Sequence, residues 1–513
     1  MAFTSFRFIV FLVLAAAAYF LTPKRCRWVT LFVANYVFYF ISGGRIFIYL
    51  LATTVTTYLA TVKIGDMAAK NKIAFNEAKA ELDKEGKKAW KAAFAKKKKR
   101  ILIPTLLFNF GILAVLKYSG FVTENLNLLF AKIGIETELP VFRFLLPLGI
   151  SFYTFQSMGY LIDVYREKQE PERNFCKLAL FISFFPQIVQ GPISRFGTLA
   201  EQLFRANEFS YTRIKFGVQL MLWGAFKKMV IADRAAVLVD NAFGFPETFG
   251  GTYVAAAALA YAIQIYGDFS GGIDIATGAA QIFGVTLDKN FERPYLATSI
   301  PDYWRRWHMT LGRFFTRYVY IPLGGNRRGK MRTLCNVMIV MLLSGLWHGA
   351  AWTFVLWGFL HGVGMIWDNL EHPHLPKKWM RQAATFAYVC MTFVFFRAES
   401  IAQGVDVLKS IVSLKWNGFV FQMASALDLT EFYMITKALS MKLPGLLSWF
   451  WLGIFVVLIA ICFRVLSGKK VSGVVALQKQ KGYGRLYPVL LAFLFTWSMI
   501  SMTGVSEYLY FSF

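Results

Sequence analysis

The sequence predicts an all-α polytopic membrane protein, and three observations support this prediction. Of the 513 residues, 57% are hydrophobic and only 17% are charged, whereas a soluble globular chain has roughly 25% charged residues. The mean hydropathy is +0.47. The apolar residues also gather in long runs, and a bilayer-spanning helix needs about 20 such residues. Composition and length together indicate one large helical membrane domain.

These apolar runs follow one another along most of the chain, and several are shorter than a full span. We expect about ten to twelve full transmembrane helices together with a few re-entrant or interfacial ones. The runs cover residues 5–22, 28–42, 46–62, 101–118, 143–163, 176–191, 214–232, 252–267, 333–346, 350–367, 382–397, 447–465 and 484–502.

Basic residues predict the orientation of these spans. The first run resembles a signal peptide, but further apolar runs follow at once, so we take it as a retained first span. The stretch "PKRCR" at 23–27 and the basic segment 63–100 should both be cytoplasmic, because Lys and Arg collect on that side. The N-terminus is then extracytoplasmic.

The segment 63–100 holds 13 Lys and Arg against 5 Asp and Glu. Opposite charges at helical spacing, such as Asp83 and Lys87, predict a cytoplasmic helix that lies near the membrane. It is either a topology anchor or a surface that attracts a polyanionic substrate. The net charge of +27 is explained by such cytoplasmic loops, and no motif indicates nucleic acid as a partner.

Two further stretches interrupt the helical pattern. The run "LALFISFFPQIVQGPISRF" at 178–196 contains Pro186, Gly191 and Pro192, which predicts a broken or re-entrant element. Residues 398–446 are expected to hold interfacial helices. The five cysteines form no C-x-x-C pair, so we expect neither a disulfide framework nor a zinc site.

The five histidines are the candidates for chemistry. His372 and His374 lie in the polar loop "EHPHLPK" and are expected at the surface. His361 would lie about 140° from His348 around one continuous helix, so these two would not share a face. This leaves His308 and His348.

His308 lies in "SIPDYWRRWHMTLGRFFTRY", residues 299–318. Ser299 and Asp302 have the spacing of a capping box. Aromatic residues then recur at intervals of three and four with arginines between them, which predicts one amphipathic interfacial helix. Trp304 and His308 would form an i, i+4 pair on its apolar face. An incidental histidine on such a helix is the alternative.

His348 lies in the uncharged run from Thr333 to Trp367, which has 35 residues. One helix of that length would measure about 52 Å, more than the roughly 30 Å of a hydrocarbon core. Because Gly345 and Gly349 flank His348, we expect the helix to break there and to leave His348 between two half-helices. An ionisable side chain inside a membrane domain indicates a functional site; a core histidine satisfied by a neighbour is the alternative. One neutral imidazole is enough for acyl transfer, since it can take a proton from an attacking hydroxyl.

Five motifs then stand in order along the middle of the chain: "LPLGISFYTFQSMGYLIDVYR" (146–166), "FFPQIVQGPISRF" (184–196), "YGDFSGGIDIATGAAQIFG" (266–284), "NFERPYLATSIPDYWRRWHMTLGRFFTRYVYIPLGGNR" (290–327) and "LSGLWHGAAWTFVLWGFLHG" (343–362). With them the chain resembles the membrane-bound O-acyltransferase (MBOAT) family, in its bacterial alginate O-acetyltransferase branch. The resemblance implies a ring of tilted helices around a central channel, in the bacterial cytoplasmic (inner) membrane. We therefore expect N-terminal transmembrane helices (1–62), the basic cytoplasmic helical segment (63–100), an MBOAT catalytic core (101–400), and interfacial helices with C-terminal transmembrane helices (401–513).

The resemblance also implies a reaction. His348 of the W-H-G motif is the expected catalytic residue, and His308 of the R-R-W-H motif is the second family histidine. An acetyl group would pass from cytoplasmic acetyl-CoA, a donor substrate rather than a bound cofactor, to an extracytoplasmic partner with a serine-hydrolase-like domain. That partner would acetylate an exopolysaccharide such as alginate or, with equal weight, peptidoglycan.

In this reaction His348 would deprotonate the acceptor hydroxyl, and His308 would orient the thioester or stabilise the developing oxyanion. Arg305 and Arg306 would contact donor phosphates or anchor the helix at the interface. Polar or aromatic residues in apolar context are candidates for lining the channel, although structural hydrogen bonding explains them equally well: Gln187, Gln190, Tyr266, Asp268, Ser270, Trp304 and Trp347.

Two alternatives remain open from the sequence. One is D-alanyl transfer to teichoic acid from an acyl carrier protein, within the same family. The other is a non-enzymatic transporter or flippase, which would share broken helices and intramembrane polar groups. The length of the chain and its basic segment favour acetyl transfer.

Overall fold

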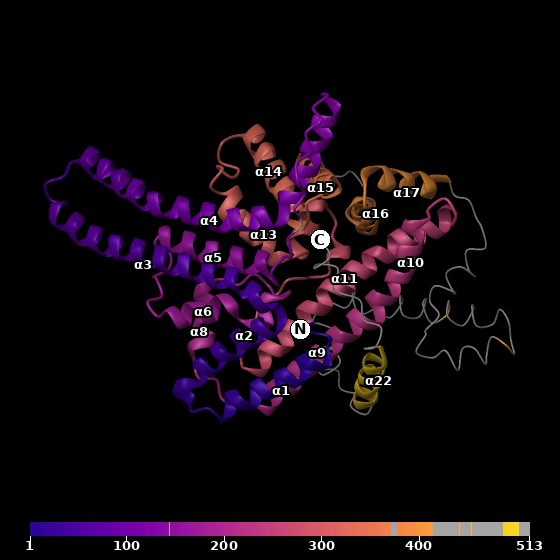
Figure 1. Ribbon diagram of the computed structural model, residues 1–513, viewed down its shortest axis with the longest axis horizontal. Helices are drawn as coiled ribbons and strands as arrows, with labels where there is room; N and C mark the ends of the chain where they lie inside the picture. The colour runs from indigo at the N-terminus through magenta and orange to yellow at the C-terminus, as the bar shows by residue number, and fades with distance from the viewer. Residues whose placement is uncertain (143, 371–376, 414–440, 442–452, 454–485, 502–513) are drawn as a thin grey trace. The chain divides into compact units, whose positions relative to one another are not determined.

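The computed structural model describes residues 1–142, 144–370, 377–413, 441, 453 and 486–501 (Figure 1). The described residues form helices joined by turns and irregular segments, without a strand, so the prediction of an all-α chain is confirmed. Apart from the first five residues, they divide into two compact units. The first comprises residues 6–214 and 279–288, and the second comprises 215–278 and the described part of 289–513.

The first unit contains the N-terminal helices. They are α1 (Phe6–Leu21), α2 (Arg27–Gly43), α3 (Phe47–Ala78), α4 (Lys84–Lys132), α5 (Ile150–Tyr165), α6 (Phe175–Ser183), α7 (Phe185–Ile188) and α8 (Phe196–Phe204), with the short 3-10 turns η1 (Lys24–Cys26) and η2 (Gly44–Ile46) on either side of α2.

The basic segment is not a separate helix, which corrects the sequence-based expectation. α3 continues through residues 62 and 63, the chain turns at 79–83, and α4 continues through residues 100 and 101. Asp83 caps α4 by accepting a hydrogen bond from the Gly86 N–H at 2.6 Å, as short polar side chains do at helix N-termini. The two arms are joined where Trp90 Nε1 donates to Asn71 Oδ1 at 3.0 Å. The basic residues therefore lie on the extended end of a helical hairpin, which Figure 1 shows as the long α3–α4 pair.

The expected break within 178–196 is confirmed. α6 ends at Ser183, α7 is a single turn, and no regular structure follows until α8. The start of α7 is buried, and its Phe185 N–H donates to Asn35 Oδ1 at 3.0 Å. This bond satisfies a donor that the helix end leaves without an intrahelical partner.

The second unit contains the remaining helices, apart from the first four residues of α9 and the last four of α11. They are α9 (Tyr211–Ala225), the π-helix η3 (Phe226–Ala232), α10 (Asp233–Gly244), α11 (Gly251–Ile282), η4 (Pro294–Leu296), α12 (Ile300–Arg306), α13 (Met309–Phe315), the π-helix η5 (Thr316–Tyr320), α14 (Lys330–His348), α15 (Trp352–Leu370), α16 (Lys378–Arg397), α17 (Ile401–Ser413) and α22 (Leu486–Ile500). Its core is rich in aromatic side chains from α11, α12, α15 and α16.

Among the described helices, α3, α4 and α14 are each long and apolar enough to cross a membrane. The expected total of ten to twelve spans, the central channel and the extracytoplasmic N-terminus stay predictions. His372, His374, all of the apolar run 447–465 except residue 453, and most of 398–446 lie outside the described residues.

Candidate active site

The chain breaks at His348, as the flanking glycines predicted. α14 ends at His348 and α15 begins at Trp352. A Cβ on Gly345 would lie 2.3 Å from the carbonyl oxygen of Phe354 and 3.2 Å from Cα of Gly358. The two helices therefore pack closely against each other as an antiparallel hairpin. The expected arrangement of two half-helices is wrong, because the chain reverses at the turn instead of continuing across the membrane.

His348 is held at this turn by aromatic rings. Its side chain is buried, and its ring lies 5.2 Å from the ring of Trp357 on α15 and 5.2 Å from that of Phe396 on α16, edge to face in both cases. Trp357 is buried as well, and its indole N–H makes no hydrogen bond within the described part of the chain. This environment keeps the imidazole away from bulk water.

A second break, which the sequence did not predict, lies at His308. α12 ends at Arg306 and α13 begins at Met309, so the expected single amphipathic helix is wrong. His308 has φ 44° and ψ 51°, a left-handed conformation that is uncommon for residues other than glycine. Trp304 and His308 are therefore not an i, i+4 pair on one helix. Trp304 instead directs its Nε1 to His361 Nδ1 at 3.3 Å.

The segment that follows α11 supplies hydrogen bonds to the backbone at this break. Asn290 accepts the Met309 N–H on its backbone oxygen at 2.9 Å, and the Glu292 N–H donates to Arg306 O at 2.9 Å. These bonds satisfy backbone groups on both sides of His308, which a buried helix end would otherwise leave unpaired. They also bring the buried side chain of Asn290 against the His308 ring, with Asn290 Oδ1 3.2 Å from His308 Nδ1.

Burial lowers the pKa of His308 to about 3. The cause is the loss of hydration, which penalises the charged imidazolium. His308 is therefore neutral at physiological pH. α12 and α13 have seven residues each, too few to span a bilayer, since a span needs about 20.

His361, which was not one of the two histidines expected at the site, is part of the same aromatic core. It is fully buried, its ring lies 4.7 Å from that of Trp357, and its Nε2 lies 3.0 Å from Thr392 Oγ1. The Thr392 hydroxyl donates to Val389 O at 2.8 Å, so His361 Nε2 is the donor to Thr392 and Nδ1 is the acceptor from Trp304. Because the chain turns after His348, His348 and His361 both contact Trp357. The angle of about 140° expected between them assumed one continuous helix and does not apply. Both ring nitrogens of His361 have partners, which indicates a supporting role.

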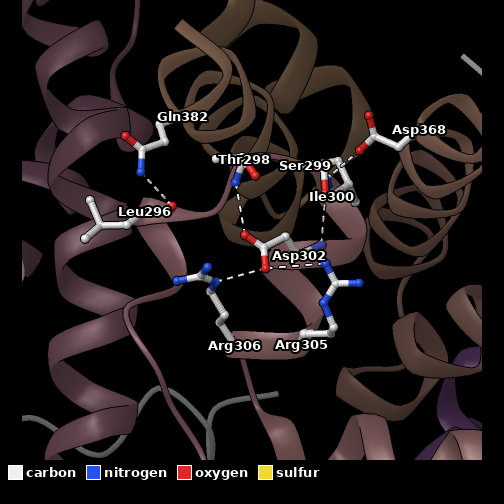
Figure 2. A network of polar contacts seen from close by, with 9 residues as sticks. All are labelled: Leu296, Thr298, Ser299, Ile300, Asp302, Arg305, Arg306, Asp368 and Gln382. Carbon is white, nitrogen blue, oxygen red and sulfur yellow. Dashed lines mark hydrogen bonds and ion pairs between the residues drawn. The ribbon is translucent and has the colours of Figure 1, made fainter. Parts of the chain in front are cut away.

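The predicted cap at the start of α12 is confirmed, and its Asp302 forms ion pairs with both candidate arginines (Figure 2). Ser299 Oγ accepts the Asp302 N–H at 3.1 Å, and Asp302 Oδ2 accepts the Thr298 N–H at 3.2 Å. Arg306 Nε lies 3.0 Å and Arg305 3.4 Å from Asp302 Oδ1. Burial alone would raise the pKa of Asp302, but the hydrogen bonds from Arg306 and Thr298 and the arginine charges lower it overall. Arg305 is the exposed member of the pair, with 70% of its side chain accessible against 32% for Arg306.

Three of the expected channel residues lie on α11 and have partners. Asp268 forms a buried ion pair with Lys228 at 2.6 Å, and Lys228 also contacts Asp233 at 2.8 Å. Ser270 accepts a hydrogen bond from Lys227 at 2.8 Å. Tyr266 packs against a ring cluster that includes Trp307, 6.4 Å away. Asp268 and Ser270 thus tie the π-helix η3 to α11, and a role in lining a channel stays a prediction.

The remaining candidates are buried. Trp347 adjoins His348 at the end of α14. Gln187 and Gln190 belong to the first unit, where Gln187 donates to Gln156 at 2.7 Å. Neither amide atom of Gln190 has a hydrogen-bond partner within the described residues.

Comparison with known proteins identifies the family. The chain is 35% identical over 413 residues to a "probable alginate O-acetylase" of Pseudomonas putida, and the match covers 78% of each chain. It is 36% identical over 348 residues to a peptidoglycan O-acetyltransferase of Helicobacter pylori, covering 61% of this chain and 64% of that protein. This chain belongs to the membrane-bound O-acyltransferase family.

The family model matches residues 166–403, which include both helix breaks and the three histidines that are buried in the described part of the chain. A teichoic acid D-alanyltransferase of Streptococcus thermophilus is a more distant relative, 28% identical over 46% of this chain and 58% of its own length. The protein is accordingly an acyltransferase, and the bilayer is its environment.

Proposed function

We propose that this acyltransferase passes an acetyl group from cytoplasmic acetyl-CoA to an extracytoplasmic partner protein, which then O-acetylates an exopolysaccharide or peptidoglycan. Support comes from the two relatives that share most of the chain and are named for O-acetyl transfer to alginate and to peptidoglycan. The site would lie in the bacterial inner membrane, where a thioester on one face can meet a hydroxyl from the other.

The reaction would centre on His348. Its imidazole takes the proton of the acceptor hydroxyl, the oxygen attacks the thioester carbonyl carbon, the C–S bond breaks, and the imidazolium returns the proton to the leaving thiolate. The observation that carries this assignment is the burial of His348 at the α14–α15 turn between Trp357 and Phe396. Aromatic walls that exclude water protect a thioester from hydrolysis.

The proposal is tested in cells that lack the gene and are complemented with variants expressed at equal level. Ester-bound acetate is released by mild base from polysaccharide and from peptidoglycan and then quantified. We expect His348→Ala to lower it to background, whereas Val363→Ala, an exposed change on the same helix α15, should leave it unchanged. Acetate that persists in His348→Ala cells would refute the assignment.

D-alanyl transfer is the second candidate, favoured by the match to the Streptococcus thermophilus enzyme. In that case the same hydrolysis would release D-alanine in place of acetate, and the loss in His348→Ala cells would affect D-alanine. A transporter would leave both esters independent of His348.

A further inference from the structure

We propose that one side of the α3–α4 hairpin is a docking surface for an acidic soluble protein of the cytoplasm. The surface would be additional to the acyl-transfer site, and binding there does not depend on which acyl group is transferred. Five lysines around the ring of Phe75 form it, and we call them the lysine face: Lys72, Lys79, Lys84, Lys87 and Lys91.

The charged loop after α5 marks where the hairpin leaves the bilayer. α3 and α4 are long and apolar enough to cross a membrane, whereas residues 166–174 include six charged residues out of nine and belong in water. The loop contacts α3 where Arg173 pairs with Asp66 at 2.7 Å. It contacts α4 where Lys98 Nζ meets Glu167 at 2.5 Å. The membrane surface therefore lies no further out than these contacts.

Beyond this level both arms continue as unbroken helices to the turn at 79–83 (Figure 1). Residues 66–78 of α3 and 84–98 of α4 extend about 18 and 21 Å at 1.5 Å per residue. A tilt of about 20°, the average for transmembrane helices, shortens these heights only slightly. The lysine face then lies about 9–21 Å beyond the loop. Because salt screens headgroup charges over about 8 Å, these lysines stand in the cytoplasm and not on the lipid surface.

The basic residues of the hairpin thus divide into two groups. Lys63 and the run 96–100 lie at the level of the charged loop, where lysines contact headgroups and fix topology. The lysine face lies further out, where soluble molecules reach it. Of the two roles expected for the basic segment, anchoring fits the base of the hairpin, and attraction of a polyanion fits its outer part.

The five lysines gather on one side of the hairpin. Lys72 and Lys79 are three and four residues from Phe75, so they share its side of α3. Lys91 of α4 brings its Nζ to 5.9 Å from the centroid of the Phe75 ring. The other two lysines lie four and seven residues before it, at helical spacing. Trp90 packs against Phe75 with ring centroids 6.0 Å apart, which holds the two arms together.

The charge of this side is not neutralised from within the hairpin. None of the five lysines forms an ion pair with another described residue, and all are exposed except Lys87, which is half-buried. Glu77 and Glu85 lie two residues from Phe75 and Lys87, about 200° around their helices. Asp83 accepts a backbone N–H of α4 as its cap. The acidic residues are therefore turned away or occupied.

Shape and charge together select the partner. The lysines line a stripe about 10 Å long on each arm, which suits carboxylates spaced along an acidic helix better than the clustered phosphates of a small molecule. A long nucleic acid would also meet the carboxylates near the turn, at Glu81 and Asp83. The chain itself offers no complement in residues 414–485, which hold nine Lys and Arg against Asp428 and Glu431. An acidic protein fits this surface best.

Photo-crosslinking of the full chain in growing cells tests the docking surface. The photo-reactive p-benzoylphenylalanine replaces Lys88, one helical turn from Lys84 and Lys91, or Ala89, on the opposite side of α4. Both positions are exposed. On irradiation we expect position 88 to form an adduct with an acidic soluble protein, identified by mass spectrometry, and position 89 to form none. His348→Ala should keep the adduct, so failure of the proposed function and failure of the docking surface are distinguishable.

The adduct supports the proposal only if it depends on the lysine face. One variant removes three of its charges: Lys72→Gln, Lys79→Gln and Lys91→Gln. The matched control removes three charges at the base of the hairpin: Lys96→Gln, Lys97→Gln and Lys99→Gln. We expect the first variant to lower the yield of the adduct about tenfold, the combined effect of three surface ion pairs, and the control to leave it unchanged.

Binding is then measured with the captured protein, purified, and the full chain in phosphatidylcholine nanodiscs. The Kd should rise about tenfold in the first variant, and it should rise in wild type between about 50 and 200 mM KCl as salt screens the charges. A Kd that neither change affects would overturn the proposal. The same holds for an adduct with phospholipid, with nucleic acid or with a protein that is not acidic, for equal adducts at both positions, and for no adduct at all.

Discussion

The two breaks that place the buried histidines are built in different ways. At His348 the chain itself makes the turn: Gly345 lets α14 and α15 approach until their backbones touch, and Gly349 follows the last helical residue. At His308 no glycine is present, and the left-handed backbone is supported by residues 290 and 292. The first break is determined by neighbouring residues, so it can be predicted from the sequence. The second depends on a tertiary contact that makes an unfavourable backbone conformation possible.

If the hairpin at His348 depends on close helix approach, Gly345→Ala should have the largest effect. The added Cβ would meet the Phe354 backbone oxygen at 2.3 Å, and a backbone atom cannot move aside as a side chain can. We expect a loss of about 3 kcal/mol in stability, at the upper end of overpacking effects, measured by thermal unfolding in detergent. Gly111→Ala on α4, where nothing lies within 4 Å, is the control and should not destabilise. Equal stability of both variants would show that the hairpin does not need the glycine.

The supporting role of His361 predicts the next effect. Thr392→Val removes the acceptor of the His361 Nε2 hydrogen and should destabilise the fold by about 1–2 kcal/mol. Thr123→Val on α4 is a matched control, because within the described residues the Thr123 hydroxyl bonds only to carbonyls of its own helix at Ser119 and Gly120. The unfolding temperature of Thr392→Val should be clearly lower than that of Thr123→Val. The interpretation of His361 as structural would fail if Thr392→Val were as stable as wild type.

The backbone at His308 predicts a difference between two substitutions that both remove the imidazole. His308→Gly should be more stable than His308→Ala by about 1 kcal/mol, because glycine adopts φ 44° without the steric cost that a Cβ adds. Activity should fall alike in both. Comparison of their unfolding temperatures checks this prediction. The reverse order of stability would mean that the break is not left-handed in solution.

The smallest effect concerns the cap that begins α12. The pKa of Asp302 is lower in the folded chain than in the unfolded one, so its contribution to stability is complete above the unfolded pKa of about 3.9 and is lost as the pH falls through the lower folded value. The difference in unfolding temperature between wild type and Asp302→Asn should be constant above about pH 5 and shrink below pH 4. A difference that does not change with pH would contradict this ionic role.

Much of this architecture was predictable from the sequence because its causes are local. The apolar runs predicted most of the described helices, and the proline and glycine positions predicted the break after α6. The cap at Ser299 and the turn at His348 also follow from neighbouring residues. In each case the residues that determine the feature lie within a few positions of it.

The missed features depend on residues that are distant in the chain. The break at His308 needs Asn290 and Glu292, the contact of His348 with Trp357 needs the hairpin to fold back, and the contact of His361 with Trp304 needs α12 to pack against α15. The basic segment was assigned to one helix because its charges suit a helix surface, whereas Asp83 begins a new helix there. An Asp three residues before Gly86 was a weak signal of this cap.

We propose above all that His348 is the general base for acetyl transfer from a donor on the cytoplasmic face. The most direct measurement is thiol release from acetyl-CoA added to inside-out membrane vesicles that contain the full chain and its partner, with wild type compared to His348→Ala at equal protein level. We expect a loss of about a thousandfold or more, in the range for removal of a general base that also initiates the attack. Thiol release by His348→Ala within tenfold of the wild-type rate would contradict the account.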